Sequence, residues 1–271
     1  MLVAVVLVGL LFGAAAIASA RPSGWWWSNA VDEPPLDIML CVGQPVTDAT
    51  TGAFLTYFAE RARTFGTQRI GLTSPNRRII PMTRDYQYAA GRLGDLAQLS
   101  RGQDEPASAA AFSPAVSYID YAPSAEDALA LCMTGFPSFD SKSSHRRSLI
   151  YLGPGQIRAS DESRRSLLTA EQVASMASVG GIQINALNPS SRAAGALPAI
   201  AKASGGQYFS LENRENRLGE DLDAIMSSPP AASAPADRVA TGWFGDAPAV
   251  PLAVAVVTSI LLCLSLVVLR R

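Results

Sequence analysis

Between residues 36 and 226, short apolar runs alternate with longer amphipathic stretches. The first run, residues 37–42, stops at Gly43 and Pro45, which predicts a fully buried strand that leads into a loop. Apolar positions then recur every three to four residues over residues 50–65, which predicts a helix with one buried face. This alternation is the main structural signal of the chain.

Later runs extend the same pattern. Residues 69–73 and 78–82 flank a Ser-Pro-Asn turn and predict a hairpin. Further strands are expected at 148–152, 182–187 and 207–211, and further helices at 85–99, 125–134, 170–179, 198–204 and 220–226. We therefore expect an α/β fold with a doubly wound, mostly parallel sheet and one antiparallel edge strand.

Local signals refine three of these boundaries. Ser124 is a candidate N-cap for the helix at 125–134, with Asp127 three residues later, and Thr169 and Gln172 form a capping box for the helix at 170–179. A Gly-Gly pair at 180–181 ends that helix. Residues 101–114, rich in Ala, Ser and Pro, predict a long loop of a functional or loosely ordered kind.

Both ends of the chain are apolar. Residues 249–269 include an uncharged stretch that precedes Arg270 and Arg271, which predicts a transmembrane helix with a cytoplasmic C-terminus. Residues 1–20 end in Ala-Ser-Ala and are either a cleaved signal or a retained anchor, and the tryptophans at 25–27 favour the anchor. Either alternative places the domain at 36–226 on the extracytoplasmic side of the membrane. Residues 227–248 form a Pro/Ala/Ser-rich linker.

Composition does not indicate a nucleic-acid partner, and it leaves open whether two of the cysteines are bridged. The formal net charge is −1 and no basic run stands out, so nothing indicates nucleic-acid binding. Cys263 lies in the C-terminal apolar run. Cys41 and Cys132 form a bridge if the domain faces an oxidising compartment, although two buried free thiols are the favoured interpretation. The single histidine, His145, is expected to be solvated in a polar loop.

Four stretches resemble the von Willebrand factor type A domain: LDIMLCVG, RIGLTSPNRRIIPMT, SLIYLGPG, and the segment from IQINAL through GGQYF to LDAI. Together they cover the region from residue 36 to residue 226. The flanking apolar segments resemble those of membrane-tethered members in bacterial envelopes. The resemblance implies a doubly wound sheet, and a binding surface at the rim where its central strands end.

In that family, the rim holds a divalent cation with Asp-x-Ser-x-Ser after the first strand and an Asp after the fourth. On this sequence those positions fall on Gly43, Pro45, Thr47 and Pro154. Neither carboxylate position is filled, and Mg²⁺ requires hard oxygen ligands. The resemblance therefore implies a degenerate metal site, and we expect no metal and no cofactor.

A threonine that the family places in a middle loop falls near Pro123 or Ser124. Asp48 is too far along to replace the missing aspartate unless a central strand runs through Pro45, which is disfavoured. Capping of the first helix by Asp48 or Thr50 is the simpler interpretation.

No catalytic constellation emerges from the sequence. The Gly-Pro-Gly at 153–155 lacks the Lys and Ser/Thr of a phosphate loop, and the single histidine follows no recognisable nucleophile, so neither an enzyme nor a small-molecule site is predicted. We expect a membrane-anchored, extracytoplasmic protein-interaction module whose partners are proteins in or at the membrane. The alternative is a structural subunit that associates through its transmembrane spans. The candidate partner-binding rim comprises Gln44, Thr47, Asp48, Thr50, Ser124 and Gln156.

Overall fold

The computed structural model describes residues 23–24, 34–102, 106–159, 161–189, 194–212, 217–231, 245–246 and 256–260. The chain divides into two compact units. One is Glu33–Ala236, and the other combines Met1–Asp32 with Asp237–Arg271. In the second unit, strand β1 (Ser23–Gly24) pairs antiparallel with β8 (Gly245–Asp246).

The two predicted membrane segments, 1–20 and 249–269, lie outside the described residues except for a helical turn at 256–260. Within the part of the chain that the structure describes, no helix is long and apolar enough to cross a membrane. The predicted linker at 227–248 is described only up to residue 231 and at 245–246.

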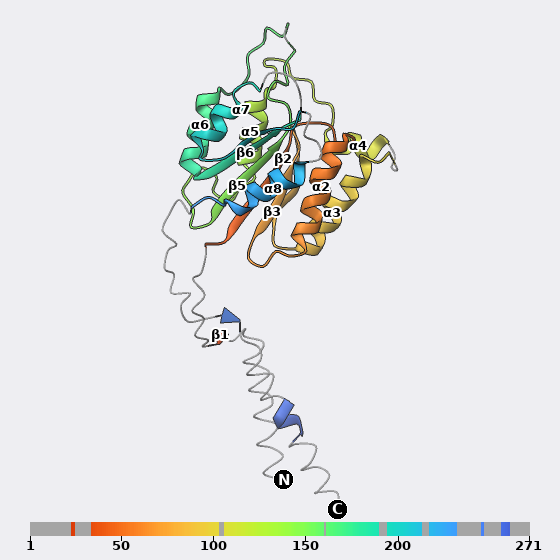
Figure 1. Cartoon of the computed structure of the whole chain (residues 1–271), viewed down its shortest axis with the longest axis vertical. Helices are drawn as coiled ribbons and strands as arrows, with labels where there is room; N and C mark the ends of the chain where they lie inside the picture. Colours follow the sequence, from red (N-terminus) through yellow and green to blue (C-terminus); the bar gives the residue numbers. More distant parts are fainter. Residues whose placement is uncertain are drawn as a thin grey trace, which may run out of the picture. The chain divides into compact units, whose positions relative to one another are not determined.

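The larger unit is built on one six-stranded sheet in the order β4-β3-β2-β5-β6-β7. Its strands are β2 (Leu36–Val42), β3 (Arg69–Thr73), β4 (Arg78–Thr83), β5 (Arg146–Leu152), β6 (Ile182–Asn188) and β7 (Tyr208–Ser210). All neighbours pair in parallel except β3 and β4. The predicted α/β class, with its mostly parallel sheet and single antiparallel edge strand, is confirmed (Figure 1).

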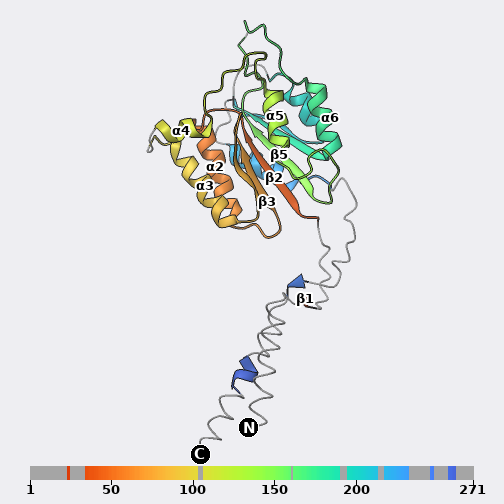
Figure 2. The same cartoon turned by 180° about the vertical axis from the view of Figure 1, so that it is seen from behind.

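Helices cover both faces of the sheet because successive strand residues point to opposite sides. One layer contains α2 (Ala49–Ala62), α3 (Tyr86–Leu99) and α8 (Leu218–Ser227), packed on strand residues such as Ile38 and Leu40. The other contains α5 (Ala125–Met133), α6 (Ala170–Gly180) and α7 (Leu197–Ala203), packed on residues such as Met39. Figures 1 and 2 show the two layers from opposite sides.

The predicted helix signals act as expected. Ser124 with Asp127, and Thr169 with Gln172, form reciprocal capping boxes at the starts of α5 and α6. Helix α6 ends at Gly181, whose φ of 59° is a left-handed conformation that glycine adopts without a Cβ clash.

Composition predicted one long loop at residues 101–114, but the structure differs there. Helix α4 (Pro106–Phe112) occupies the centre of this stretch. Pro106 stands at the first helical position, where a missing amide hydrogen costs nothing, and alanines follow with the highest helix propensity. Phe112, only 2% exposed, belongs to the same buried cluster as the core residues of α2 and α3. Packing of this side chain stabilises the short helix, and the composition of the segment gives no sign of that added stability.

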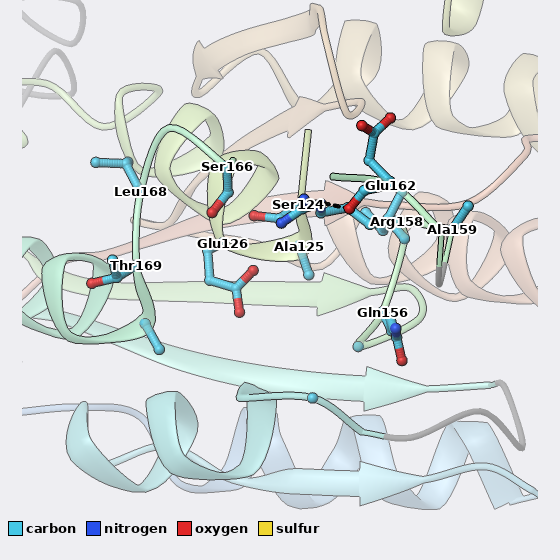
Figure 3. A pocket seen from close by; sticks show the side chains of 14 residues that line it. Ser124, Ala125, Glu126, Gln156, Arg158, Ala159, Glu162, Ser166, Leu168 and Thr169 are labelled. Atoms are coloured by element: carbon cyan, nitrogen blue, oxygen red, sulfur yellow. Dashed lines mark hydrogen bonds between the residues drawn. The ribbon is translucent and has the colours of Figure 1, made fainter. Parts of the chain in front are cut away.

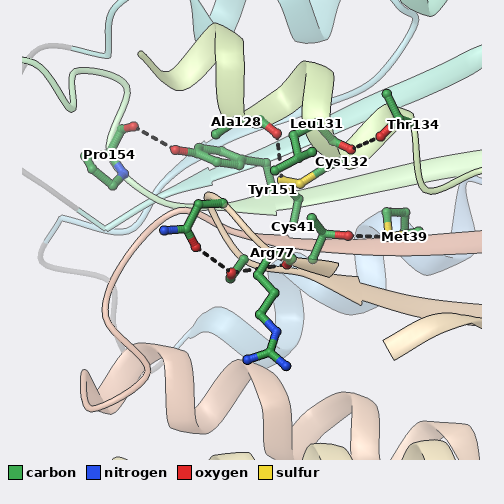
Figure 4. The surroundings of a disulfide bond; sticks show 12 residues. Met39, Cys41, Arg77, Ala128, Leu131, Cys132, Thr134, Tyr151 and Pro154 are labelled. Carbon is green, nitrogen blue, oxygen red and sulfur yellow. Dashed lines mark hydrogen bonds between the residues drawn. A yellow bond between two sulfur atoms is a disulfide. The ribbon is translucent and has the colours of Figure 1, made fainter. Parts of the chain in front are cut away.

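Cys41 and Cys132 form a disulfide, so the favoured prediction of two free thiols is wrong. Cys41 lies on the face of β2 that packs against α5, and Cys132 lies in the last turn of α5 with its Cα 5.8 Å away. The bond ties the central strand to the helix covering it, across a sequence separation of 91 residues (Figure 4).

His145 is not a solvated loop residue either. Its Nδ1 lies 3.0 Å from a carboxylate oxygen of Asp37, which is fully buried at the start of β2. Arg69 donates two hydrogen bonds to the same carboxylate. A buried carboxylate requires compensating partners, and the neighbouring strands β3 and β5 bring these two side chains to it. Sequence reasoning missed the cluster because its members are 32 and 108 residues from Asp37.

Candidate functional site

The carboxyl ends of β2 and β5 meet at the point where the strand order reverses. The chain leaves β2 toward β3 and β4 on one side, and returns through β5 toward β6 and β7 on the other. Doubly wound sheets bind ligands in the crevice at such a switch point. Here Gly43 follows β2 and Gly153 follows β5, and the amide of Gly43 donates to the carbonyl of Leu152 at 2.7 Å.

The side chain of Tyr151 fills this switch point. A Cβ added to Gly43 would lie 2.3 Å from the tyrosine oxygen, and one added to Gly153 would lie 2.6 Å from it. Both glycines therefore leave room for the ring. Tyr151 is fully buried, and its hydroxyl donates to the carbonyl of Pro154 at 3.0 Å (Figure 4). Burial raises the pKa of this phenol, which remains protonated.

The residues at this point do not fit a divalent cation. Gly43 and Pro154 carry no side-chain ligand atom, the carbonyl of Pro154 already accepts the Tyr151 hydroxyl, and the Tyr151 phenol is neutral. Ser124 uses its hydroxyl to accept the Asp127 amide at the start of α5. Among the described residues there is no group of three or more His, Cys, Asp and Glu side chains placed to hold a metal. The hydroxyls of Thr47 and Ser124 cannot replace the carboxylates that complete the oxygen shell of a bound Mg²⁺.

The first part of the predicted rim lies at the N-terminus of α2. Asp48 is the N-cap, and its carboxylate accepts the amides of Thr50 and Thr51 at 2.8 and 3.4 Å. Gln44 donates to Asp48 at 3.0 Å and to the hydroxyl of Thr51 at 2.8 Å. Asp48 therefore acts as a helix cap. Thr47 is exposed and, with Gln44, lines a hollow of ≈ 320 Å³ next to α4.

The second part of the rim is a separate open cleft of ≈ 470 Å³. The buried Ser124 is one of its lining residues, while Gln156 and Arg158 come from the loop after β5 (Figure 3). Glu162 lies on the same loop, and hydrogen bonds with Arg164 lower its pKa to about 2. The structure thus brings Gln44, Asp48 and Thr50 together in one group and Ser124 with Gln156 in another. Gln44 and Gln156 line two different cavities.

An apolar groove of ≈ 480 Å³ lies beside the cleft and was missed by sequence reasoning. Its lining includes Val116, Tyr118 and Tyr121 from the segment between α4 and α5, and Leu167 from the segment before α6. Ile119 follows Tyr118 and is 85% exposed. The signal in the sequence is a run of apolar and aromatic residues, AVSYIDYAP, in a stretch with no helix or strand periodicity.

Known proteins resemble the chain in backbone arrangement alone. No family model and no curated protein sequence matches it. Among solved structures it is similar to the crystal structure of the TFIIH p34 N-terminal domain, with 10% identity, a TM-score of 0.46, and coverage of 72% of this chain and 98% of that one. It is also similar to the human COPII-coat protein Sec24c, with 12% identity, a TM-score of 0.41, and coverage of 73% of this chain but 32% of that one.

Proposed function

We propose that this chain is a membrane-anchored, extracytoplasmic protein-interaction module of von Willebrand type A architecture, and that it binds its partner without a bridging metal. It would belong to the type tethered in bacterial envelopes. The partner would contact the rim at the carboxyl edge of the sheet, which includes Gln44, Thr47 and Gln156.

The observation that carries this proposal is the tyrosine at the switch point. Tyr151 occupies the space between Gly43 and Gly153 where a ligand-binding crevice would open. With that space filled by a neutral, hydrogen-bonded phenol, the edge offers a surface in place of a coordination site. Contact between surfaces needs no cation, so partner affinity should be the same with and without a chelator.

The disulfide supports the proposed location. Disulfides persist in oxidising compartments and are rare in the cytosol. The Cys41–Cys132 bond lies between a central strand and its covering helix, so it belongs to the folded core of the domain. Membrane anchoring itself rests on the apolar sequences at 1–20 and 249–269 and on Arg270 and Arg271.

Exposed residues of the rim provide the test. Thr47→Lys and Gln156→Lys place charges on the surface without removing a cap, and Lys142→Glu is a control on the segment before β5, at the opposite edge of the sheet. Crosslinked partner recovered from cells that make the protein should fall at least tenfold with the rim variants, and should not fall with the control. If the partner stays bound to both rim variants and is lost when residues 249–269 are replaced by an unrelated apolar span, the protein is a structural subunit.

A further inference from the structure

The two ends of the chain come together in the smaller unit. Strand β1 pairs antiparallel with β8, and Ser23 lies opposite Asp246. In an antiparallel pair, the chain that leads into one strand runs beside the chain that leaves the other. The apolar residues 1–20 precede β1 and the apolar residues 249–269 follow β8, so both segments start from the same end of this strand pair. The two ends of the chain also belong to one compact unit.

Aromatic residues follow in sequence at the opposite end of the same strand pair. Trp25 directly follows β1 and Phe244 directly precedes β8, and further tryptophans stand at positions 26, 27 and 243. Tryptophan is enriched where a membrane meets water. On a membrane-anchored chain, the strand pair therefore marks the extracytoplasmic surface, and both apolar segments lead from it into the bilayer.

The helical turn at 256–260 has one covered side. Thr258 is only 7% exposed, whereas Val256, Val257 and Ile260 on the same turn are 52%, 55% and 55% exposed. Threonine and valine are both β-branched and nearly equal in shape, so a helix by itself would cover them alike. The difference means that another segment packs against the Thr258 side. A polar residue on the covered side, with apolar residues on the open side, is the arrangement expected of a packed membrane helix.

The register of the strand pair predicts which residues lie level with Thr258. Thr258 follows Asp246 by 12 residues. The same count back from Ser23 ends at residue 11, midway between Gly9 and Gly13. Two helices with the same rise of about 1.5 Å per residue therefore reach equal depth at these positions. The Gly-x-x-x-Gly spacing places both glycines on one helix face, where the absence of side chains permits the close approach of a second helix.

We propose that residues 1–20 are retained in the mature protein and pack against residues 249–269 as an antiparallel pair of transmembrane helices, with Gly9 and Gly13 against Thr258. The inference rests on the proposed function, which anchors the chain through residues 249–269, and it deepens that function by naming the segment that covers Thr258. Close contact through the glycines keeps the threonine hydroxyl away from lipid. Residue 1 then lies on the cytoplasmic side, as the C-terminal arginines do, because the two spans run in opposite directions.

Intact mass spectrometry of the protein purified from membranes of cells that make it gives the first test. We expect a chain that still carries the apolar segment 1–20. A chain that begins at Arg21 would overturn the inference, while the proposed function would stand because the anchor at 249–269 remains. Recovery of the protein from the soluble fraction alone would overturn both.

Paired cysteines in the full-length chain test the packing itself. Cys263→Ala first removes the one cysteine that is not part of the disulfide of the domain. In that background, Thr258→Cys is combined with Gly9→Cys or with Gly13→Cys, so that one glycine always remains, and membranes are treated with a mild oxidant. We expect an intramolecular disulfide, identified by peptide mass spectrometry, from at least one of these pairs.

Two further sets of variants are matched controls. Val256→Cys, on the same turn and 52% exposed, replaces Thr258→Cys and should give at least tenfold less product. Ser23→Cys with Asp246→Cys, opposite each other in the strand pair, shows that oxidation takes place. Equal yields from Thr258→Cys and Val256→Cys, no product from Thr258→Cys, or a disulfide between two copies of the chain would refute the packing. Failure of the strand pair to bond would contradict the register on which the inference rests.

Discussion

Removal of the disulfide should cost a large part of the stability of the domain. Cys41 and Cys132 close a loop with a sequence separation of 91 residues. In the chain-entropy model, opening such a loop restores denatured-state entropy that corresponds to about 4.6 kcal/mol at 25 °C. Domains of ordinary size are stable by only about 5–15 kcal/mol, so the loss brings this one close to unfolding.

Urea unfolding of the full-length chain, monitored by far-ultraviolet circular dichroism, measures this loss. With an m-value of about 2 kcal/mol/M, the midpoint should fall by about 2 M in the Cys41→Ala/Cys132→Ala variant or after reduction. Cys263→Ala is the matched control and should leave the midpoint unchanged. The chain has 3 cysteines, so the denatured, unreduced protein should react with a thiol reagent at one site per chain. Three reactive thiols, or equal midpoints before and after reduction, would refute the reasoning.

Three further predictions concern the switch point and the buried ionic cluster. Gly43→Ala should destabilise the domain by about 1–3 kcal/mol in urea unfolding, because its new methyl group would overlap the Tyr151 oxygen. A gain in stability would contradict the packing of that ring. Burial raises the pKa of Tyr151, and burial with a hydrogen bond to Asp223 raises that of Tyr57. The unfolded state therefore loses protons first above pH 10, and the free energy of unfolding should decline there, but less in Tyr151→Phe. Asp37→Ala should cost about 3–5 kcal/mol by leaving Arg69 unpaired, and a cost below that of Gly43→Ala would argue against the cluster.

The sequence predicted the fold because its signals are local. The apolar run of β2 with its stop at Gly43, the reciprocal caps of α5 and α6, and the glycine that ends α6 each act within a few residues. Asp48 likewise caps α2, one of the alternatives considered from the sequence. Such signals define the order of elements, and the order constrains the sheet to very few topologies.

The features that were missed depend on contacts between distant residues. The resemblance stated from the sequence placed two missing carboxylates at Gly43 and Pro154. Sequence reasoning did not predict that the Tyr151 ring fills the space between Gly43 and Gly153, because Tyr151 counted only as one apolar residue of a strand. The disulfide depends on the packing of α5 against β2, and the groove depends on contact between two segments that are 46 residues apart at Tyr118 and Arg164. The periodicity of apolar residues carries no information about contacts between segments that are distant in the sequence.

Binding without a metal is the central claim, and a calorimetric titration of the full-length chain with Mg²⁺ or Mn²⁺ tests it most directly. Tyr151 fills the switch point, and neither Gly43 nor Pro154 offers a side-chain ligand atom. We therefore predict that the heat of each injection equals the heat of dilution. A saturable one-site isotherm that disappears in the presence of a chelator would contradict the account.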